Sequence, residues 1–91
     1  MSEIDPYEGL LKSLKAQSDW PMVYLFKFIV PNDNQKLAQA EALFGEAAQV
    51  SLNQSKTGKY ISVSARELML NPDSVIERYR QAAKIEGIIS L

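Results

Sequence analysis

The chain has 91 residues, of which 46% are hydrophobic and 23% charged, a composition typical of one globular domain with a single core. Ten basic against eleven acidic residues give a formal net charge of -1, which excludes a strong overall attraction to nucleic acid or to an anionic membrane. Cysteine and histidine are both absent, so disulfides, thiolate metal sites and thiol or imidazole catalysis are excluded.

Residues 1 to 18 are predicted to form an N-terminal extension with one short amphipathic helix. Apolar residues recur at three-to-four-residue spacing over residues 6 to 16, at Tyr7, Leu10, Leu11 and Leu14. About three turns of helix are marginal alone, so we expect this helix to dock on the rest of the chain. The segment lacks a signal-peptide pattern, and no apolar run approaches the ~20 residues of a membrane span. We therefore expect a cytoplasmic protein with no membrane contact.

Residues 20 to 30 are the strongest strand candidate. Both faces of this segment are largely apolar, which favours a central strand. One face carries Tyr24, Phe26, Phe28 and Val30, and the other carries Val23, Leu25, Lys27 and Ile29.

A helix is predicted next, after Pro31-Asn32-Asp33, which ends the strand and offers a helix cap. This helix would have an apolar stripe at Leu37, Ala40, Leu43 and Phe44 and a C-terminal cap at Gly45. Residues 46 to 55 then alternate apolar and polar side chains, which predicts a strand with one buried and one wet face. The buried face would carry Ala48, Val50 and Leu52, and the wet face Gln49, Ser51 and Asn53.

Gly58 marks a hairpin turn, because a tight reversal needs the positive φ that glycine adopts freely. Residues 59 to 68 return antiparallel, with Ile61, Val63 and Ala65 on one face and Tyr60, Ser62, Ser64 and Arg66 on the other. Asn71 and Pro72 begin a second helix. Gly87 follows its last turn, and residues 88 to 91 form a short strand.

Residues 19 to 91 therefore predict an α+β fold: a ferredoxin-like βαββαβ sandwich with a four-stranded antiparallel sheet and two helices on one face. The expected core is Phe26, Phe28, Leu37, Phe44, Val50, Leu52, Ile61, Val63, Val75 and Tyr79. The opposite sheet face would be open unless the N-terminal helix or a second subunit covers it.

The sequence resembles the bacterial YbeD-like family of small domains of unknown function. The resemblance covers roughly residues 19 to 91. It rests on Trp20-Pro21, on Phe26-Lys27-Phe28-Ile29 and, most specifically, on the hairpin from Ser55 to Val63 with Lys59-Tyr60 after its glycine. It implies a ferredoxin-like fold akin to the ACT domains, which sense small molecules for metabolic enzymes. The family offers no catalytic residues to carry over, and residues 1 to 18 depart from its compact pattern.

Site chemistry is sparse in the sequence. The acids are scattered, no carboxylate loop of the calcium type is present, and Gly58 alone does not make a phosphate loop. We therefore expect no catalytic residues, no metal and no cofactor. Four-stranded sheets also serve as RNA-binding platforms, but paired aromatics are missing from the predicted open face, which disfavours nucleic acid.

The open sheet face is the candidate binding surface. Its chemistry-bearing residues are Lys27, Lys59, Tyr60, Ser62, Ser64 and Arg66. We expect a noncatalytic regulatory or partner-binding module that meets a protein partner or a small-molecule ligand here. A structural protein that uses the same face for assembly, with a homodimer as one form, remains the alternative, and an RNA-binding module is a weaker one.

Overall fold

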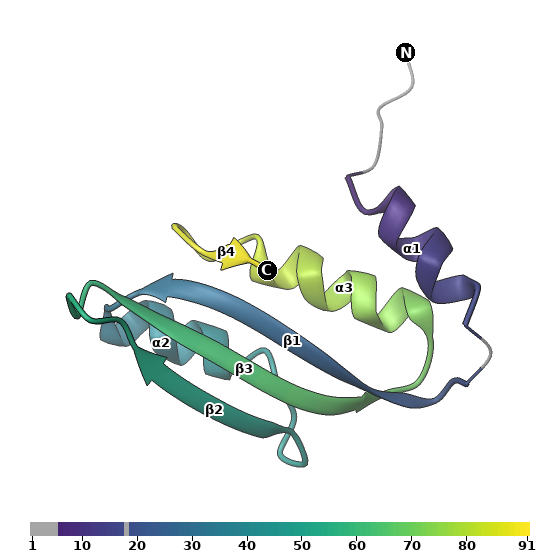
Figure 1. Cartoon of the computed structure of the whole chain (residues 1–91), viewed down its shortest axis with the longest axis horizontal. Helices are drawn as coiled ribbons and strands as arrows, with labels where there is room; N and C mark the ends of the chain where they lie inside the picture. Colours follow the sequence, from purple (N-terminus) through teal and green to yellow (C-terminus); the bar gives the residue numbers. More distant parts are fainter. Residues whose placement is uncertain (1–5, 18) are drawn as a thin grey trace.

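The computed structural model describes residues 6–17 and 19–91. Within these residues the chain forms three helices and four strands, drawn in Figure 1. In chain order they are α1 (Glu8–Lys15), β1 (Met22–Pro31), α2 (Asn34–Glu41), β2 (Gln49–Gln54), β3 (Tyr60–Met69), α3 (Pro72–Ala82) and β4 (Ile89–Ser90). The predicted extension of residues 1 to 18 begins and ends outside the described residues.

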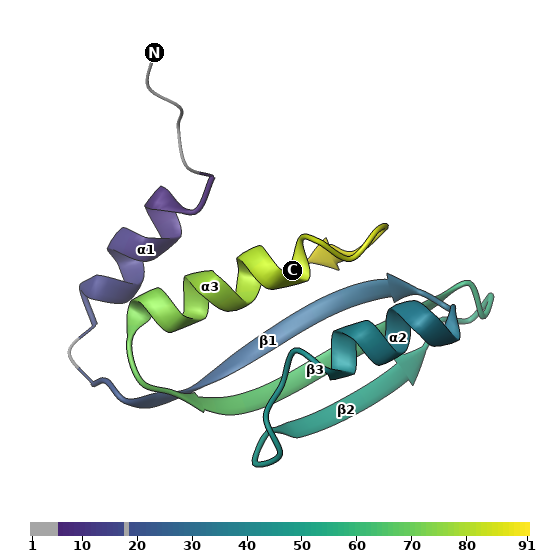
Figure 2. The same ribbon diagram turned by 180° about the vertical axis from the view of Figure 1, so that it is seen from behind.

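The strands form one sheet in the order β2-β3-β1-β4, and each neighbouring pair is antiparallel. Phe28 lies opposite Val63 in the central pair, and Leu52 lies opposite Val63 on its other side. The strands stand in front of α2 in Figure 1, whereas α2 stands in front of them in Figure 2. The predicted α+β class and four-stranded antiparallel sheet are confirmed.

The predicted helix and turn signals agree with the structure at three positions. The Asp33 side chain accepts hydrogen bonds from the backbone N–H groups of Gln35 and Lys36, which caps α2. Asn71 and Ser74 cap each other's backbone at the start of α3. Gly58 has a φ of 74°, in the left-handed region that its hairpin turn requires.

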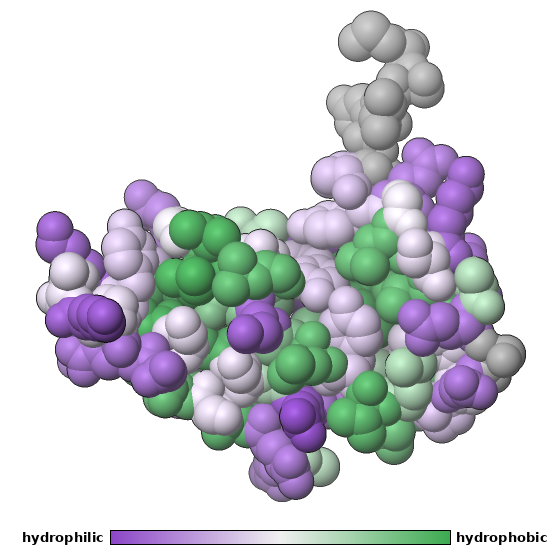
Figure 3. Space-filling model, viewed as in Figure 1, coloured by the Kyte–Doolittle hydropathy of each residue, from purple (hydrophilic) through white to green (hydrophobic). Residues whose placement is uncertain are grey.

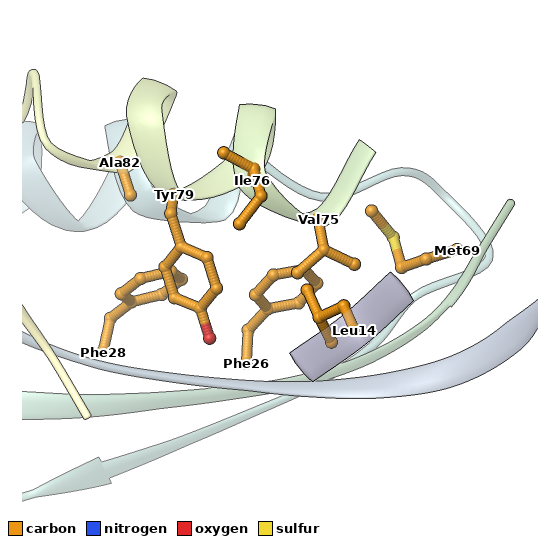
Figure 4. Packing of buried hydrophobic residues seen from close by; sticks show 8 residues of the cluster. All are labelled: Leu14, Phe26, Phe28, Met69, Val75, Ile76, Tyr79 and Ala82. Atoms are coloured by element: carbon orange, nitrogen blue, oxygen red, sulfur yellow. The ribbon is translucent and has the colours of Figure 1, made fainter. Parts of the chain in front are cut away.

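The core lies between the sheet and the helices, as Figure 4 shows for its central cluster. Phe26 and Phe28 of β1 are fully buried and point toward Val75 and Tyr79 of α3. Each ring centroid lies within 6 Å of the Tyr79 ring, at 5.5 and 5.8 Å, in edge-to-face geometry that aromatic pairs favour. This burial confirms the predicted inward face of β1.

The prediction that Val50 and Leu52 belong to the core is wrong. They point to the helix side of the sheet but remain 40% and 46% exposed. The cause is the position of β2 at the sheet edge, since α2 packs mainly against β1 and β3 and leaves the outer strand uncovered. Of the other expected core residues, Leu37 and Phe44 are partly buried against the core, and the rest are buried.

Gly45 does not cap α2. The helix ends at Glu41, and its C-cap Ala42 is right-handed. Leu43 and Phe44 continue the chain through tight turns, donating backbone hydrogen bonds to the carbonyls of Ala40 and Glu41. A left-handed residue is therefore not needed at Gly45, which lacks a positive φ.

Helix α1 docks on α3 and not on the open sheet face. Leu14 is 3% exposed and belongs to the same buried cluster as Phe26 and Val75. The Trp20 indole donates a hydrogen bond to the Leu14 carbonyl at 3.0 Å, which ties the end of the helix to the start of β1. Both views place α1 beside α3, far from β2. The sequence left two possible covers for the open face, this helix or a second subunit. The first of these expectations is therefore wrong.

Candidate functional site

The sheet face turned away from the helices carries several exposed apolar side chains. Figure 3 views the molecule from this side and shows apolar surface interrupted by polar groups. Val23 and Leu68 lie opposite each other on β1 and β3 and are 59% and 58% exposed. Leu25 is 48% exposed, and Ile89 of β4 lies exposed beside Ile29. We call this surface the open face.

A hollow of about 410 Å³ lies near the middle of the open face. The strand register builds it from two adjacent rows of side chains. In one row, Ser64 of β3 lies between Lys27 of β1 and Ser51 of β2. In the next row, Arg66 of β3 lies between Leu25 of β1 and Gln49 of β2. These six residues, contributed by three strands, line the hollow.

The two cations of this hollow have no ion-pair partner within residues 6–17 and 19–91. The strand residues of the open face, as described, include no acid. Arg78 behaves differently on the helix side, where its guanidinium binds the Glu67 carboxylate at 2.6 and 3.3 Å and lies over the Phe26 ring. The hydrogen bond from Arg78 lowers the pKa of Glu67. Unlike Arg78, therefore, Lys27 and Arg66 carry positive charges that no described acidic side chain neutralises.

A second hollow of about 360 Å³ adjoins the first, and the two share Gln49 and Arg66. Its remaining lining comes from Val23, Ala47 and Leu68. The open face therefore combines a cationic depression with an apolar one, joined at the Arg66 side chain.

The structure brings together only half of the predicted binding residues. Lys27, Ser64 and Arg66 line the first hollow. Ser62 lies on the open face one row further along, opposite Ile29. Tyr60 is six positions from Arg66 along β3, which corresponds to about 20 Å.

Lys59 lies in the hairpin, outside the strand. Its carbonyl accepts a hydrogen bond from the backbone N–H of Asn32. Lys59 and Tyr60 therefore belong to the hairpin end of the domain.

Gln49, Ser51 and Leu68 contribute to the site but were not among the predicted binding residues. The alternation of residues 46 to 55 had already placed Gln49 and Ser51 on the wet face. The strand register, which places Ser51 in the row of Lys27 and Gln49 in the row of Arg66, could not be predicted from the sequence. Leu68 has the same strand parity as Arg66, which was the available signal for it.

A tyrosine cluster on the helix side is the other notable polar arrangement. The Tyr24 and Tyr79 hydroxyls are 3.0 Å apart, and the Tyr7 hydroxyl donates to the Tyr79 carbonyl at 3.4 Å. Burial, together with the hydrogen bond to Tyr24, raises the pKa of Tyr79 far above its usual range. A hydroxyl held in its neutral form is a poor nucleophile, so this cluster reads as a packing feature that ties α1 and α3 to β1.

In the part of the chain that the structure describes, there is no group of three acidic side chains placed to hold a metal ion. Over the same residues, none of the helices has the length and apolar character needed to cross a membrane. A third hollow, beside α2, is lined by Lys36 and Lys84 together with Asp33 and Glu86. Its charges are mixed, unlike those of the open face.

Comparison of the chain with protein-family models, with curated proteins and with solved structures finds no match. The resemblance to the YbeD-like family accordingly stays a prediction.

Proposed function

We propose that this protein is a noncatalytic partner-binding or regulatory module that acts through its open face. The observation that carries the proposal is the set of exposed apolar side chains on that face, at Val23, Leu25, Leu68 and Ile89. Monomeric soluble proteins rarely leave a contiguous apolar patch bare, and large patches of this kind mark interaction sites. The docking of α1 against α3 leaves the patch available.

The proposed scaffold is ferredoxin-like. The strand order β2-β3-β1-β4, with α2 and α3 packed on one face, supports this assignment. The YbeD-like resemblance, and through it a likeness to ACT domains, is part of the same proposal. The proposal of a noncatalytic role draws support from the absence of histidine and cysteine in the sequence.

The test is quantitative affinity capture from native lysate with the tagged full-length chain and two matched double variants. The first variant, Leu25→Ala with Leu68→Ala, removes apolar side chains from the open face. The second, Val50→Ala with Leu52→Ala, removes apolar side chains of similar exposure from the opposite side of the sheet. Each lost leucine contact is worth about 1 kcal/mol, so the first variant should weaken partner binding roughly 30-fold.

The proposal predicts a stoichiometric partner that the open-face variant loses and the β2 variant retains. Thermal-shift screening of metabolites, run in parallel, would show whether a small molecule binds as well. Turnover of a defined substrate by the pure protein, abolished by one point substitution, would overturn the noncatalytic role. A partner lost only with the Val50 and Leu52 variant would show that the binding surface is not the open face.

A further inference from the structure

We infer that the open face binds a protein partner that inserts a carboxylate side chain, flanked by apolar side chains, between Lys27 and Arg66. The inference rests on the proposed function and adds the chemistry of the partner. It follows from the charge, the hydrogen-bonding groups and the depth of the first hollow.

Charge complementarity selects an anion. Lys27 and Arg66 line one hollow, and neither has an ion-pair partner among the described residues. The strand residues of the open face that the structure describes supply no carboxylate. A partner that covered these cations with apolar groups alone would desolvate them without compensation, which costs binding free energy. The partner must therefore bring a negative group to this position.

The neutral lining of the hollow suits a carboxylate. Ser64 lies opposite Lys27 in the same row, and Ser51 follows Ser64 on the edge strand; the hydroxyls of both serines make no hydrogen bond within the described part of the chain. An ionised carboxylate accepts about four hydrogen bonds, and charge-assisted ones are the strongest. The Arg66 guanidinium, the Lys27 ammonium and the two hydroxyls supply enough donors.

The shallowness of the two hollows favours a protein partner over a small molecule. Leu25 lines the first hollow and is half exposed, and Val23 and Leu68 in the second are more exposed still. A small-molecule site buries most of its ligand, which such shallow hollows do not. A protein surface instead spreads over both hollows, with its acid over Arg66 and its apolar side chains over Val23 and Leu68.

A second copy of this chain is a poorer occupant. Stacking two open faces would bring Lys27 and Arg66 together with their own copies and would supply no acid, because the described open-face strand residues include none. Single-stranded nucleic acid would supply phosphates, but its binding sites also carry aromatic rings on which bases stack. Tyr60 lies about 20 Å along the strand from Arg66, too far to serve the same hollow.

The experiment selects a random displayed-peptide library on the full-length protein, with counter-selection against a Lys27→Gln and Arg66→Gln double variant. The matched control is Lys36→Gln with Lys84→Gln, which removes two lysines from the mixed-charge hollow beside α2. Unchanged circular dichroism and thermal unfolding would verify that each variant is folded. Calorimetry then measures the affinity of the selected peptides, of their Glu→Gln or Asp→Asn versions, of inorganic phosphate and of a 12-nucleotide oligouridine.

The inference predicts peptides with one acid between apolar residues. Neutralising the acid, or neutralising Lys27 and Arg66, should each weaken binding about tenfold or more. Applying both changes should add little further, because both remove the same interaction. The control variant should bind like the wild type.

Several outcomes would overturn the inference: a library that yields no binder, binders without an acid, or affinities unchanged by the Lys27 and Arg66 substitutions. Tighter binding of phosphate or oligouridine would reassign the hollow to a small anion or to RNA. Self-association lost with the same substitutions would reassign it to a second copy. If the natural partner is lost on removal of Leu25 and Leu68 but retained by the charge variant, this inference fails while the proposed function stands.

Discussion

Replacing Phe28 by alanine tests the assignment of the two sheet faces. Phe28 is fully buried, and its ring centroid lies 6.2 Å from those of Phe26 and Phe44 and 5.8 Å from that of Tyr79. Burying a phenylalanine side chain contributes about 1.5 to 3 kcal/mol, and aromatic pairs and the cavity left behind add to the loss. We therefore expect the free energy of unfolding to fall by about 3 to 5 kcal/mol.

This loss is a large share of the total, since a chain of this length is typically stable by about 5 to 14 kcal/mol. Equilibrium urea unfolding, followed by circular dichroism and by the fluorescence of the single tryptophan, Trp20, measures it. If the alanine variant does not fold, Phe28→Leu provides a measurable substitute, with an expected loss of about 1 to 1.5 kcal/mol.

Leu25→Ala is the matched control for this experiment. Leu25 lies on the same strand but on the open face, where it is half exposed. Its truncation should cost less than about 1 kcal/mol. A Phe28→Ala loss below about 1.5 kcal/mol, or an equal loss for Leu25→Ala, would refute the assignment of the inward and outward faces.

Three further substitutions probe other parts of the structure. Glu67→Gln should cost about 1 kcal/mol at pH 7. The hydrogen bond from Arg78 lowers the pKa of Glu67 below its ordinary value of 4.5, so the wild type should lose this advantage as the pH falls below that value. Acid titration of thermal stability would show equal losses in both proteins if the pair contributes nothing. Leu14→Ala should destabilise the protein by about 2 to 4 kcal/mol in urea unfolding, and a loss under 1 kcal/mol would mean that α1 is not docked. Gly58→Ala should lower stability by about 1 to 2 kcal/mol, because the φ of Gly58 is 74°. The control Gly9→Ala, at a position in α1 with open space around it, should raise stability by up to about 1 kcal/mol. Similar effects at both positions would contradict the hairpin geometry.

Local sequence signals predicted the elements and their facing well. The strict alternation of β1 separates buried Phe26 and Phe28 from exposed Val23 and Leu25. Helix caps at Asp33 and Asn71 lie where the sequence placed them. These features depend on residues close together in the chain, which is why the sequence alone specifies them.

Features that depend on tertiary packing were less accessible. Val50 and Leu52 alternate like a buried strand, yet they are exposed because no described helix spreads over the edge strand. The docking of Leu14 against α3 joins segments that are far apart in the chain, so local sequence patterns do not specify it. The same holds for the first hollow, since the juxtaposition of Lys27 with Ser51 and Arg66 requires the register of three strands.

Site-specific photo-crosslinking would show whether the open face is a partner-binding surface. A photoreactive amino acid would replace Leu25 on the open face or, as a control, Gln39 on the exposed side of α2. If a partner binds the open face, position 25 should give one defined heterologous adduct in native lysate, absent from position 39 and reduced by Lys27→Gln with Arg66→Gln. Equal adducts from both positions, or none from position 25 while a partner still co-purifies with the chain, would contradict it.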